Sequence, residues 1–243
     1  MDVSLISLGE MRRLGYFSYV CPLRNCIAMN RVLRKIVFAC LAGLLLVPAL
    51  RAQVAFGVRA GGAYSSLIQK VDNRFEAGGH FGFSVAGVVD IPLSHNKRWS
   101  LRPELAFANQ GGSYYSEQQL RGMALHNSCW YYSLQVPVNV AYTFPFTDVR
   151  LSVFAGPAFD WSLFGKMKSR ETAPDLHFGV SPEKDLKPCD LAASIGLAFE
   201  YNRFFFSVNA LCGVIDRRAS KREGETSVYQ NNVTFSLGYF FRR

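Results

Sequence analysis

Alternation of apolar residues with polar or very small ones is the feature of this chain that most limits its fold. In residues 190–201 the apolar parity includes Leu191 and Phe199, whereas the other parity includes Ser194. A period of two places these sets on opposite faces of a β-strand. Only two residues separate this run from a second one, residues 204–214, so the two runs predict a β-hairpin.

Eight alternating stretches follow residue 53, and they predict eight strands. The stretches cover residues 54–64, 78–91, 99–109, 130–142, 149–162, 190–201, 204–214 and 233–241. Short connections near residues 92–98, 143–148 and 202–203 alternate with long ones near residues 65–75, 111–128, 163–187 and 216–231. An even number of strands of about ten residues, with short turns at one end and long loops at the other, is typical of outer-membrane barrels with short periplasmic turns and long extracellular loops.

The chemistry of the two strand faces favours a membrane barrel over a soluble one. The apolar parity carries no charge at the strand centres, where a lipid-facing Lys or Arg would cost about 2–4 kcal/mol. The other parity is rich in Gly, Ala and Ser, which fit the narrow interior of eight strands. In the alternative, a soluble lipocalin-like barrel, these small residues would form the outer surface, where soluble proteins carry long charged side chains. We therefore predict an all-β, eight-stranded antiparallel transmembrane β-barrel, an up-and-down meander in the outer-membrane lipid of a Gram-negative bacterium.

A targeting segment precedes the predicted barrel. An apolar stretch, residues 36–47, is too short to span a membrane as a helix, and it follows a group of basic residues. These basic residues are Arg31, Arg34 and Lys35. The pattern is typical of a secretory signal peptide, and we expect residues 29–52 to form it, with cleavage between Ala52 and Gln53.

The signal peptide separates two other segments, residues 1–28 before it and residues 53–243 after it. Residues 53–243 are expected to form the barrel domain. Residues 1–28 precede Met29, where translation could begin. We expect these 28 residues to be a mis-annotated upstream extension that contributes no folded structure.

The net charge of +9 could indicate a nucleic-acid partner, but its distribution argues against one. Residues 1–52 hold seven basic and two acidic residues, which leaves 20 basic and 16 acidic residues in the rest of the chain. No compact Lys/Arg block with interleaved aromatic residues follows residue 52, so we expect no nucleic-acid binding.

Charged residues of inward parity are the clearest candidates for a functional group. They are Arg59, Asp90, Arg102, Glu104, Arg150 and Glu200. Isolated charges in a narrow, dry lumen are costly, so these residues are expected to form an interlocking network of arginines and carboxylates with Glu104 at its centre. Such a network would plug and stiffen the barrel, and a path for protons or ions is the alternative.

A second polar group is expected at the outer mouth. His80, Asp160 and Asp190 have inward parity near the long loops. We expect them to form a solvated rim, and the alternative is a site for a divalent cation or an anchor for the loops.

The cysteines and one Ser/His pair complete the candidates. Cys129 and Cys189 lie at the outer ends of their predicted strands, in an oxidising location, and are candidates for a disulfide. Their strands are not neighbours, so a loop would have to bend over the strand between them. His126 and Ser128 are residue types that serine hydrolases pair, but nothing in the sequence supplies a third partner. We predict no catalytic residue, no metal site and no cofactor.

Five short stretches resemble a family of barrels. They are residues 56–66, residues 101–107 followed by Gly111, residues 132–138, residues 154–157 and residues 190–201. In this order they are similar to the Bacteroidetes-type outer membrane protein beta-barrel family, often labelled PorT-like. The resemblance covers nearly all of residues 53–243. The biochemical roles of that family are mostly unassigned, one branch is linked to type IX secretion, and the resemblance implies no catalytic residue in this chain. The last strand of that family ends at an aromatic residue, whereas Arg242 and Arg243 follow Phe241 here.

These observations predict a small plugged barrel with a structural, adhesion or secretion-associated role that acts through its extracellular loops. The expected partners are outer-membrane lipid, the barrel-assembly machinery, and a protein at the extracellular loops or on the periplasmic side. Two alternatives remain: a narrow channel or transporter for small solutes, and an outer-membrane lipid-modifying enzyme.

Overall fold

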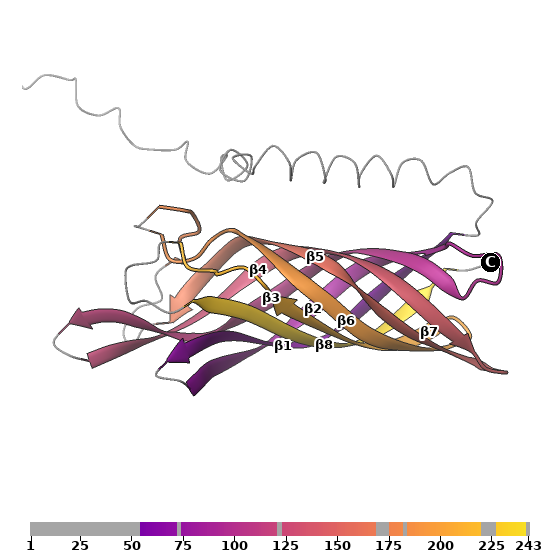
Figure 1. The fold of residues 1–243 in the computed structure, drawn as a ribbon, viewed down its shortest axis with the longest axis horizontal. Coiled ribbons are helices and arrows are strands. Elements are labelled where there is room, and N and C mark those ends of the chain that lie inside the picture. The colour runs from indigo at the N-terminus through magenta and orange to yellow at the C-terminus, as the bar shows by residue number, and fades with distance from the viewer. Residues whose placement is uncertain are drawn as a thin grey trace, which may run out of the picture.

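A computed structural model describes residues 54–71, 74–120, 123–168, 175–181, 184–219 and 227–241. In these ranges eight antiparallel strands form a closed barrel in which each strand pairs with its neighbours in sequence and β1 pairs with β8 (Figure 1). The strands are β1 (Ala55–Val71), β2 (Arg74–Pro92), β3 (Trp99–Leu120), β4 (Met123–Pro145), β5 (Val149–Lys168), β6 (Cys189–Tyr201), β7 (Phe204–Gly213) and β8 (Val228–Phe240). The predicted eight-stranded meander is confirmed.

The expected extension at residues 1–28, the expected signal peptide at residues 29–52 and its cleavage point at Ala52 and Gln53 lie outside the described residues. In the part of the chain that is described, no helix has the length and apolar character needed to cross a membrane.

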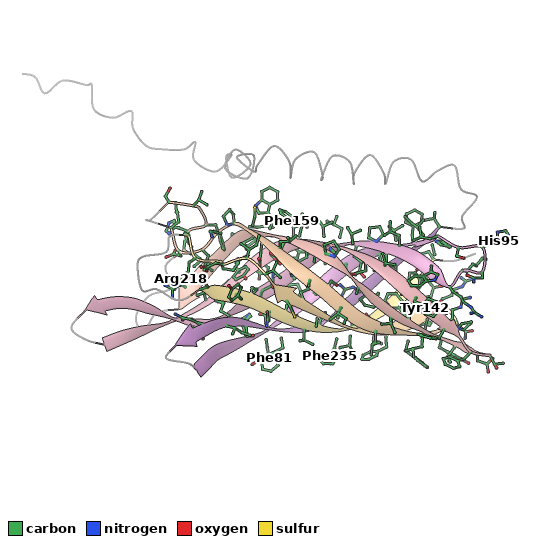
Figure 2. The ribbon with its side chains drawn as sticks, viewed as in Figure 1. Phe81, His95, Tyr142, Phe159, Arg218 and Phe235 are labelled. Carbon is green, nitrogen blue, oxygen red and sulfur yellow. The ribbon has the colours of Figure 1, made fainter. Side chains whose placement is uncertain are left out.

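The two faces of the strands differ as the alternation predicts. Along β6, buried and exposed residues alternate at every position from Asp190 to Tyr201. The exposed set is apolar: Phe81 on β2 is 82% exposed and Leu237 on β8 is 69% exposed. Figure 2 shows Phe81 and Phe235 at the outer side of the barrel wall. Large apolar side chains therefore cover the outside of the barrel, whereas the inside holds small and polar side chains together with a few buried aromatic ones such as Phe154, Phe205 and Phe240.

The two ends of the barrel are built differently. At one end, which we call the inner mouth, short turns connect β2 to β3, β4 to β5 and β6 to β7. Two turn residues, Lys97 with φ 55° and Asn202 with φ 57°, adopt the left-handed conformation that lets the chain reverse within a few residues. The first strand begins and the last strand ends at this mouth, because Gly57 pairs with Phe240.

At the other end, which we call the outer mouth, the strands are longer than the alternation predicts. The regions expected to be loops at residues 65–75 and 111–128 are largely strand, in the hairpins β1–β2 and β3–β4 that project beyond the barrel body (Figure 1). The pairing of β2 with β3 shifts register between Gly78 and Ser84, and Gly78 with Ser113 is its outermost pair among the described residues. Beyond the membrane both faces of a strand meet water, so backbone pairing continues without the apolar period that reveals a strand in sequence.

Aromatic rings gather at the inner mouth. Trp99 packs edge-on against Tyr142 at 4.9 Å between ring centroids, and Tyr142 packs against Phe144 at 4.8 Å. On the other side of the barrel, Phe204 lies 5.1 Å from Tyr239. These outward rings occupy the level at which amphipathic aromatic side chains contact a membrane interface.

Candidate functional site

The lumen holds charged side chains that the strands place inward by parity. Five of the six predicted lumen residues are buried, and the exception is Arg150, whose side chain is 53% exposed at the inner mouth. Arg150 has the predicted inward parity, since it pairs with Glu200 and lines the cavity at the inner mouth, but its side chain is half exposed rather than buried in the lumen. Its strand, β5, begins only one residue earlier, at Val149, so the side chain reaches water beyond the strand end.

Arg59 and Glu104 form the closest of these ion pairs. Arg59 Nη2 lies 2.8 Å from Glu104 Oε2, and Nε donates a hydrogen bond to the same oxygen at 2.9 Å. Arg59 Nη1 also donates to Ser236 Oγ at 3.3 Å. Arg59 is on β1, Glu104 is on β3 and Ser236 is on β8, so the contacts cross the lumen and connect strands on both sides of β1.

Two further pairs lie nearer the inner mouth. Arg102 Nε donates to Asp90 Oδ1 at 3.0 Å, and its Nη2 donates to Ser152 Oγ at 3.1 Å. Arg150 Nη1 lies 3.8 Å from Glu200 Oε1, a looser contact. The ion pairs among the six predicted residues are thus three separate Arg–carboxylate pairs. The prediction that Glu104 is the centre of one interlocking network is wrong, because Arg59 is the only arginine within ion-pair distance of Glu104 in the described part of the chain.

Toward the outer mouth, Asp160 is the acceptor at the centre of a hydrogen-bond group. Its Oδ2 accepts from Gln110 Nε2 at 2.6 Å, from Gln135 Nε2 at 2.7 Å and from Ser133 Oγ at 3.2 Å. Three donors on one oxygen stabilise a buried carboxylate. His80 does not join this group, because its Nε2 contacts Asn109 Oδ1 at 2.8 Å instead.

Asp160 and Asp190 face each other across the β5–β6 pairing, and both are buried. Asp160 is 6% exposed and Asp190 is 2% exposed, so the expected solvated rim is wrong for these two residues. The reason is that the connections after β5 and β7 pack over this end of the lumen.

Arg217 is the functional candidate that sequence reasoning missed. It belongs to the connection between β7 and β8, yet it has no exposed surface. Its Nη2 donates to Ser162 Oγ at 2.8 Å, and its guanidinium lies 5.3 Å from the centre of the Tyr131 ring, in the range of a cation–π contact. A connection has no parity to indicate that one of its arginines points inward, so the sequence holds no signal for this position.

Backbone contacts tie the connection that carries Arg217 to its surroundings. Arg217 N donates to Val228 O at 2.8 Å, and Lys187 N donates to Arg217 O at 2.7 Å. Lys187 Nζ also donates to the Asp216 carbonyl at 2.9 Å. Leu186, which is fully buried, belongs to an apolar cluster with Leu67, Cys129, Tyr131, Leu176 and Val228.

The Asp216 side chain supports the same segment. Its Oδ1 accepts hydrogen bonds from Val228 N at 3.0 Å and from Arg218 N at 3.2 Å. Partial burial acts to raise the pKa of Asp216, but these backbone donors outweigh it and hold the pKa below its usual value. The carboxylate is therefore ionised at neutral pH and available to both amides.

The expected disulfide between Cys129 and Cys189 is wrong. Cys129 is a free, buried thiol, whereas Cys189 takes part in a disulfide that does not involve Cys129. On β5, Cys129 of β4 pairs with Met167 and Cys189 of β6 pairs with Trp161, so the two β5 positions are six residues apart. That offset corresponds to about 20 Å along a strand, far beyond the Cα separation of a disulfide.

The described residues contain no group of three or more His, Cys, Asp or Glu side chains that could hold a metal ion. Ser128 lies on β4, and the His126 side chain is outside the part of the chain whose side chains are described.

A cavity of about 670 Å³ opens at the inner mouth. Its lining combines the base of the lumen with the turn between β2 and β3. The lining residues are Val54, Ala55, Asp90, Pro92, Asn96, Lys97, Arg98, Ser100, Arg102, Thr143, Pro145, Arg150, Glu200 and Phe241. The barrel is thus hollow at its inner mouth, while buried side chains occupy the lumen at its outer end.

Comparison with known proteins gives the following matches. The model of a family described as "Outer membrane protein beta-barrel domain" matches residues 49–216. No curated relative matches the chain. Similar solved structures include the attachment invasion locus protein Ail of Yersinia pestis in complex with the heparin analogue sucrose octasulfate, at 14% identity and a TM-score of 0.42, covering 78% of this chain and 99% of that one. OprG of Pseudomonas aeruginosa is 13% identical with a TM-score of 0.43, covering 79% and 98%. Neisserial surface protein A is 10% identical with a TM-score of 0.43, covering 76% and 96%.

Proposed function

Because the chain belongs to the outer membrane protein beta-barrel domain family, located in the outer membrane of Gram-negative bacteria, we propose that it is a plugged barrel that acts through its extracellular loops. Its role would be structural, adhesive or associated with secretion. The inner mouth then faces the periplasm and the outer mouth faces the cell exterior.

The observation that carries the proposal is the complete burial of Arg217. An arginine from an extracellular connection contacts Ser162 on β5 and Tyr131 on β4, so the connection is inserted between the barrel walls. Withdrawing it would expose the apolar cluster around Leu186 and break the backbone contacts to Lys187 and Val228. Each of these losses costs free energy and therefore opposes opening of the outer mouth.

The lumen below supports the same proposal. The Arg59–Glu104 pair crosses from β1 to β3 with both side chains buried, so an open path along the axis would require this pair to separate. Breaking a buried pair without new partners costs about 3–5 kcal/mol, which corresponds to a closed state favoured by more than a hundredfold.

Reconstitution in planar bilayers tests the plug. We expect no stable single-channel openings from the wild-type protein, under conditions in which an open porin conducts. A narrow channel or transporter for small solutes is the competing function, and reproducible unitary currents from the wild-type protein would establish it instead. The variant R59Q/E104Q/R217A serves as a positive arm, because it removes both the buried pair in the lumen and the buried guanidinium at the outer mouth, and transient openings are expected from it if these groups close the barrel.

The partner side can be mapped in intact cells. Photo-crosslinking residues placed at Val180, in the extracellular connection between β5 and β6, and at Phe146, in the periplasmic turn between β4 and β5, occupy exposed positions on opposite sides of the membrane. We expect a discrete crosslinked partner from Val180 rather than Phe146. Crosslinks confined to Phe146 would move the role to the periplasmic side.

The finer assignments are also proposals. Residues 56–66, 101–107, 132–138, 154–157 and 190–201 support membership of the PorT-like, Bacteroidetes-type branch. The apolar stretch at residues 36–47 supports a signal peptide that delivers the chain to the barrel-assembly machinery. We propose no catalytic role. A serine-reactive probe that labels the wild-type protein but not the variant S128A would favour a lipid-modifying enzyme instead.

A further inference from the structure

The cavity at the inner mouth has the dimensions of a binding site rather than of a surface depression. Its volume of about 670 Å³ lies within the range of about 300–1,000 Å³ that small ligands occupy in proteins. Its lining comes from the inner-mouth ends of β1 to β6, together with the turn between β2 and β3 and Phe241 after β8. A ligand would therefore enter from the aqueous periplasm along the barrel axis, not from the surrounding lipid.

The base of this cavity is polar and held in place. Arg102 is buried and is fixed by Asp90 at 3.0 Å and by Ser152 at 3.1 Å. Thr143 is fixed by the same Ser152 hydroxyl at 2.8 Å. Ser100 is 3% exposed, and its Oγ has no hydrogen-bond partner in the described part of the chain. The base thus offers polar groups on a rigid strand framework, including one hydroxyl whose hydrogen-bonding capacity is not used within the protein.

The rim of the cavity is basic. The lining contains four basic residues, Lys97, Arg98, Arg102 and Arg150, and two acidic ones, Asp90 and Glu200, a net charge of +2. Asp90 is already compensated by Arg102. Arg98 is exposed and has no ion-pair partner among the residues that the structure describes.

Arg150 adds a second accessible guanidinium. Its side chain is 53% exposed and its contact with Glu200 is long, at 3.8 Å, so most of its N–H donors face the cavity opening or solvent. Arg98 lies in the β2–β3 turn and Arg150 lies at the start of β5, so the two side chains reach the opening from different parts of the barrel. Two guanidinium groups placed in this way can each bind one carboxylate with paired hydrogen bonds.

We propose that the inner mouth is a binding site for a periplasmic ligand with two or more carboxylates, of the size and chemistry of a short acidic peptide. The carboxylates contact Arg98 and Arg150 at the rim, and the polar base around Ser100 and Arg102 receives the peptide groups. The site requires only that the inner mouth faces the periplasm, and it does not depend on the plug or on an extracellular partner.

Binding of a labelled peptide tests the site on the full-length protein in zwitterionic detergent micelles. The probe is a fluorescent triglutamate peptide, and triglutamine with the same label is the uncharged comparison. We expect saturable binding of triglutamate that weakens as salt is raised, and little binding of triglutamine. Equal binding of the two peptides would overturn the proposal, because it would show that the carboxylates are not recognised.

Variants of matched charge locate the binding. R98Q/R150Q removes two positive charges at the inner mouth, and K166Q/K184Q removes two at the outer end, where Lys166 is exposed and Lys184 is half-buried. We expect triglutamate binding to weaken roughly tenfold in R98Q/R150Q and to stay unchanged in K166Q/K184Q, because only the first variant removes guanidinium–carboxylate contacts. Equal loss in the two variants would show a nonspecific effect of net charge and would overturn the proposal.

Two further arms complete the design. R98Q alone keeps the Arg150–Glu200 pair, so it remains informative if the double variant folds poorly, and a several-fold loss of affinity for triglutamate is expected from it.

Vesicles that contain phosphatidylglycerol test the alternative source of anionic groups at this level of the membrane. If R98Q/R150Q loses affinity for these vesicles but keeps its affinity for triglutamate, the arginines contact lipid headgroups at the barrel edge and the proposed cavity site is refuted.

Discussion

Replacing Glu104 by glutamine should destabilise the barrel far more than the same replacement at Glu200. Glu104 Oε2 receives two contacts from Arg59, at 2.8 and 2.9 Å, and both side chains are less than a tenth exposed. In E104Q the Arg59 guanidinium stays in the lumen without its counter-charge, because no other carboxylate lies within ion-pair distance of it among the described residues.

The expected magnitudes follow from this difference in burial. An uncompensated buried charge costs about 3–5 kcal/mol, so E104Q should lose about that much free energy of unfolding. In E200Q the arginine left behind is Arg150, which is 53% exposed at the inner mouth and can be solvated by water. An exposed pair contributes about 1 kcal/mol or less, so E200Q should lose no more than that.

Urea unfolding in phospholipid vesicles measures both changes, with tryptophan fluorescence and gel migration before and after heating as independent readouts. The variant R59Q/E104Q provides the third corner of the comparison, since a chain that lacks the arginine should recover most of the stability lost in E104Q. A loss below about 1 kcal/mol in E104Q, or equal losses in E104Q and E200Q, would refute the reasoning that this lumen is dry enough to require pairing.

Two other predictions test the packing of the strands and the state of the thiols. A Cβ at Gly61 would collide with the Phe235 carbonyl, whereas a Cβ at Gly62 meets nothing. In the same unfolding assay, G61V should therefore lose about 1–3 kcal/mol or more of unfolding free energy and G62V should be nearly neutral. Equal effects would contradict the assignment of Gly61 and Gly62 to opposite faces of the strand. A small, membrane-permeable maleimide should label exposed Cys212 in the folded barrel and should label buried Cys129 only after denaturation, as read by mass spectrometry; rapid labelling of Cys129 in the folded protein would contradict its burial.

The strands that cross the membrane could be predicted because lipid on one side and a narrow lumen on the other impose a strict period of two. The same argument failed for the upper parts of the first four strands. At residues 65–71 and 111–120 the pairing continues where no lipid imposes an apolar face, so the backbone forms strand while the sequence pattern indicates a loop. Strand length beyond the membrane depends on pairing between segments, which a local pattern does not reveal.

Only part of the candidate site could be predicted from the sequence. Arg59, Glu104 and Asp160 have inward parity in the sequence and are buried in the structure, but parity does not identify their contacts. Arg59 on β1 reaches Glu104 on β3 across the lumen, and Asp160 binds glutamines from β3 and β4. Which inward residues meet depends on the stagger between strands around a closed barrel, a property of the whole sheet.

By itself, the sequence determined the number of membrane-crossing strands, the face of each strand that meets lipid and the parity of the charges inside. These are consequences of a repeating local environment. Only the tertiary structure decided that Arg217 is buried, that Cys129 and Cys189 are too far apart to bridge, and that a basic cavity opens at the inner mouth. These three features depend on how the connections pack back onto the barrel and on the register between strands that are distant in sequence. Closure of the sheet sets such contacts, so a local sequence pattern does not reveal them.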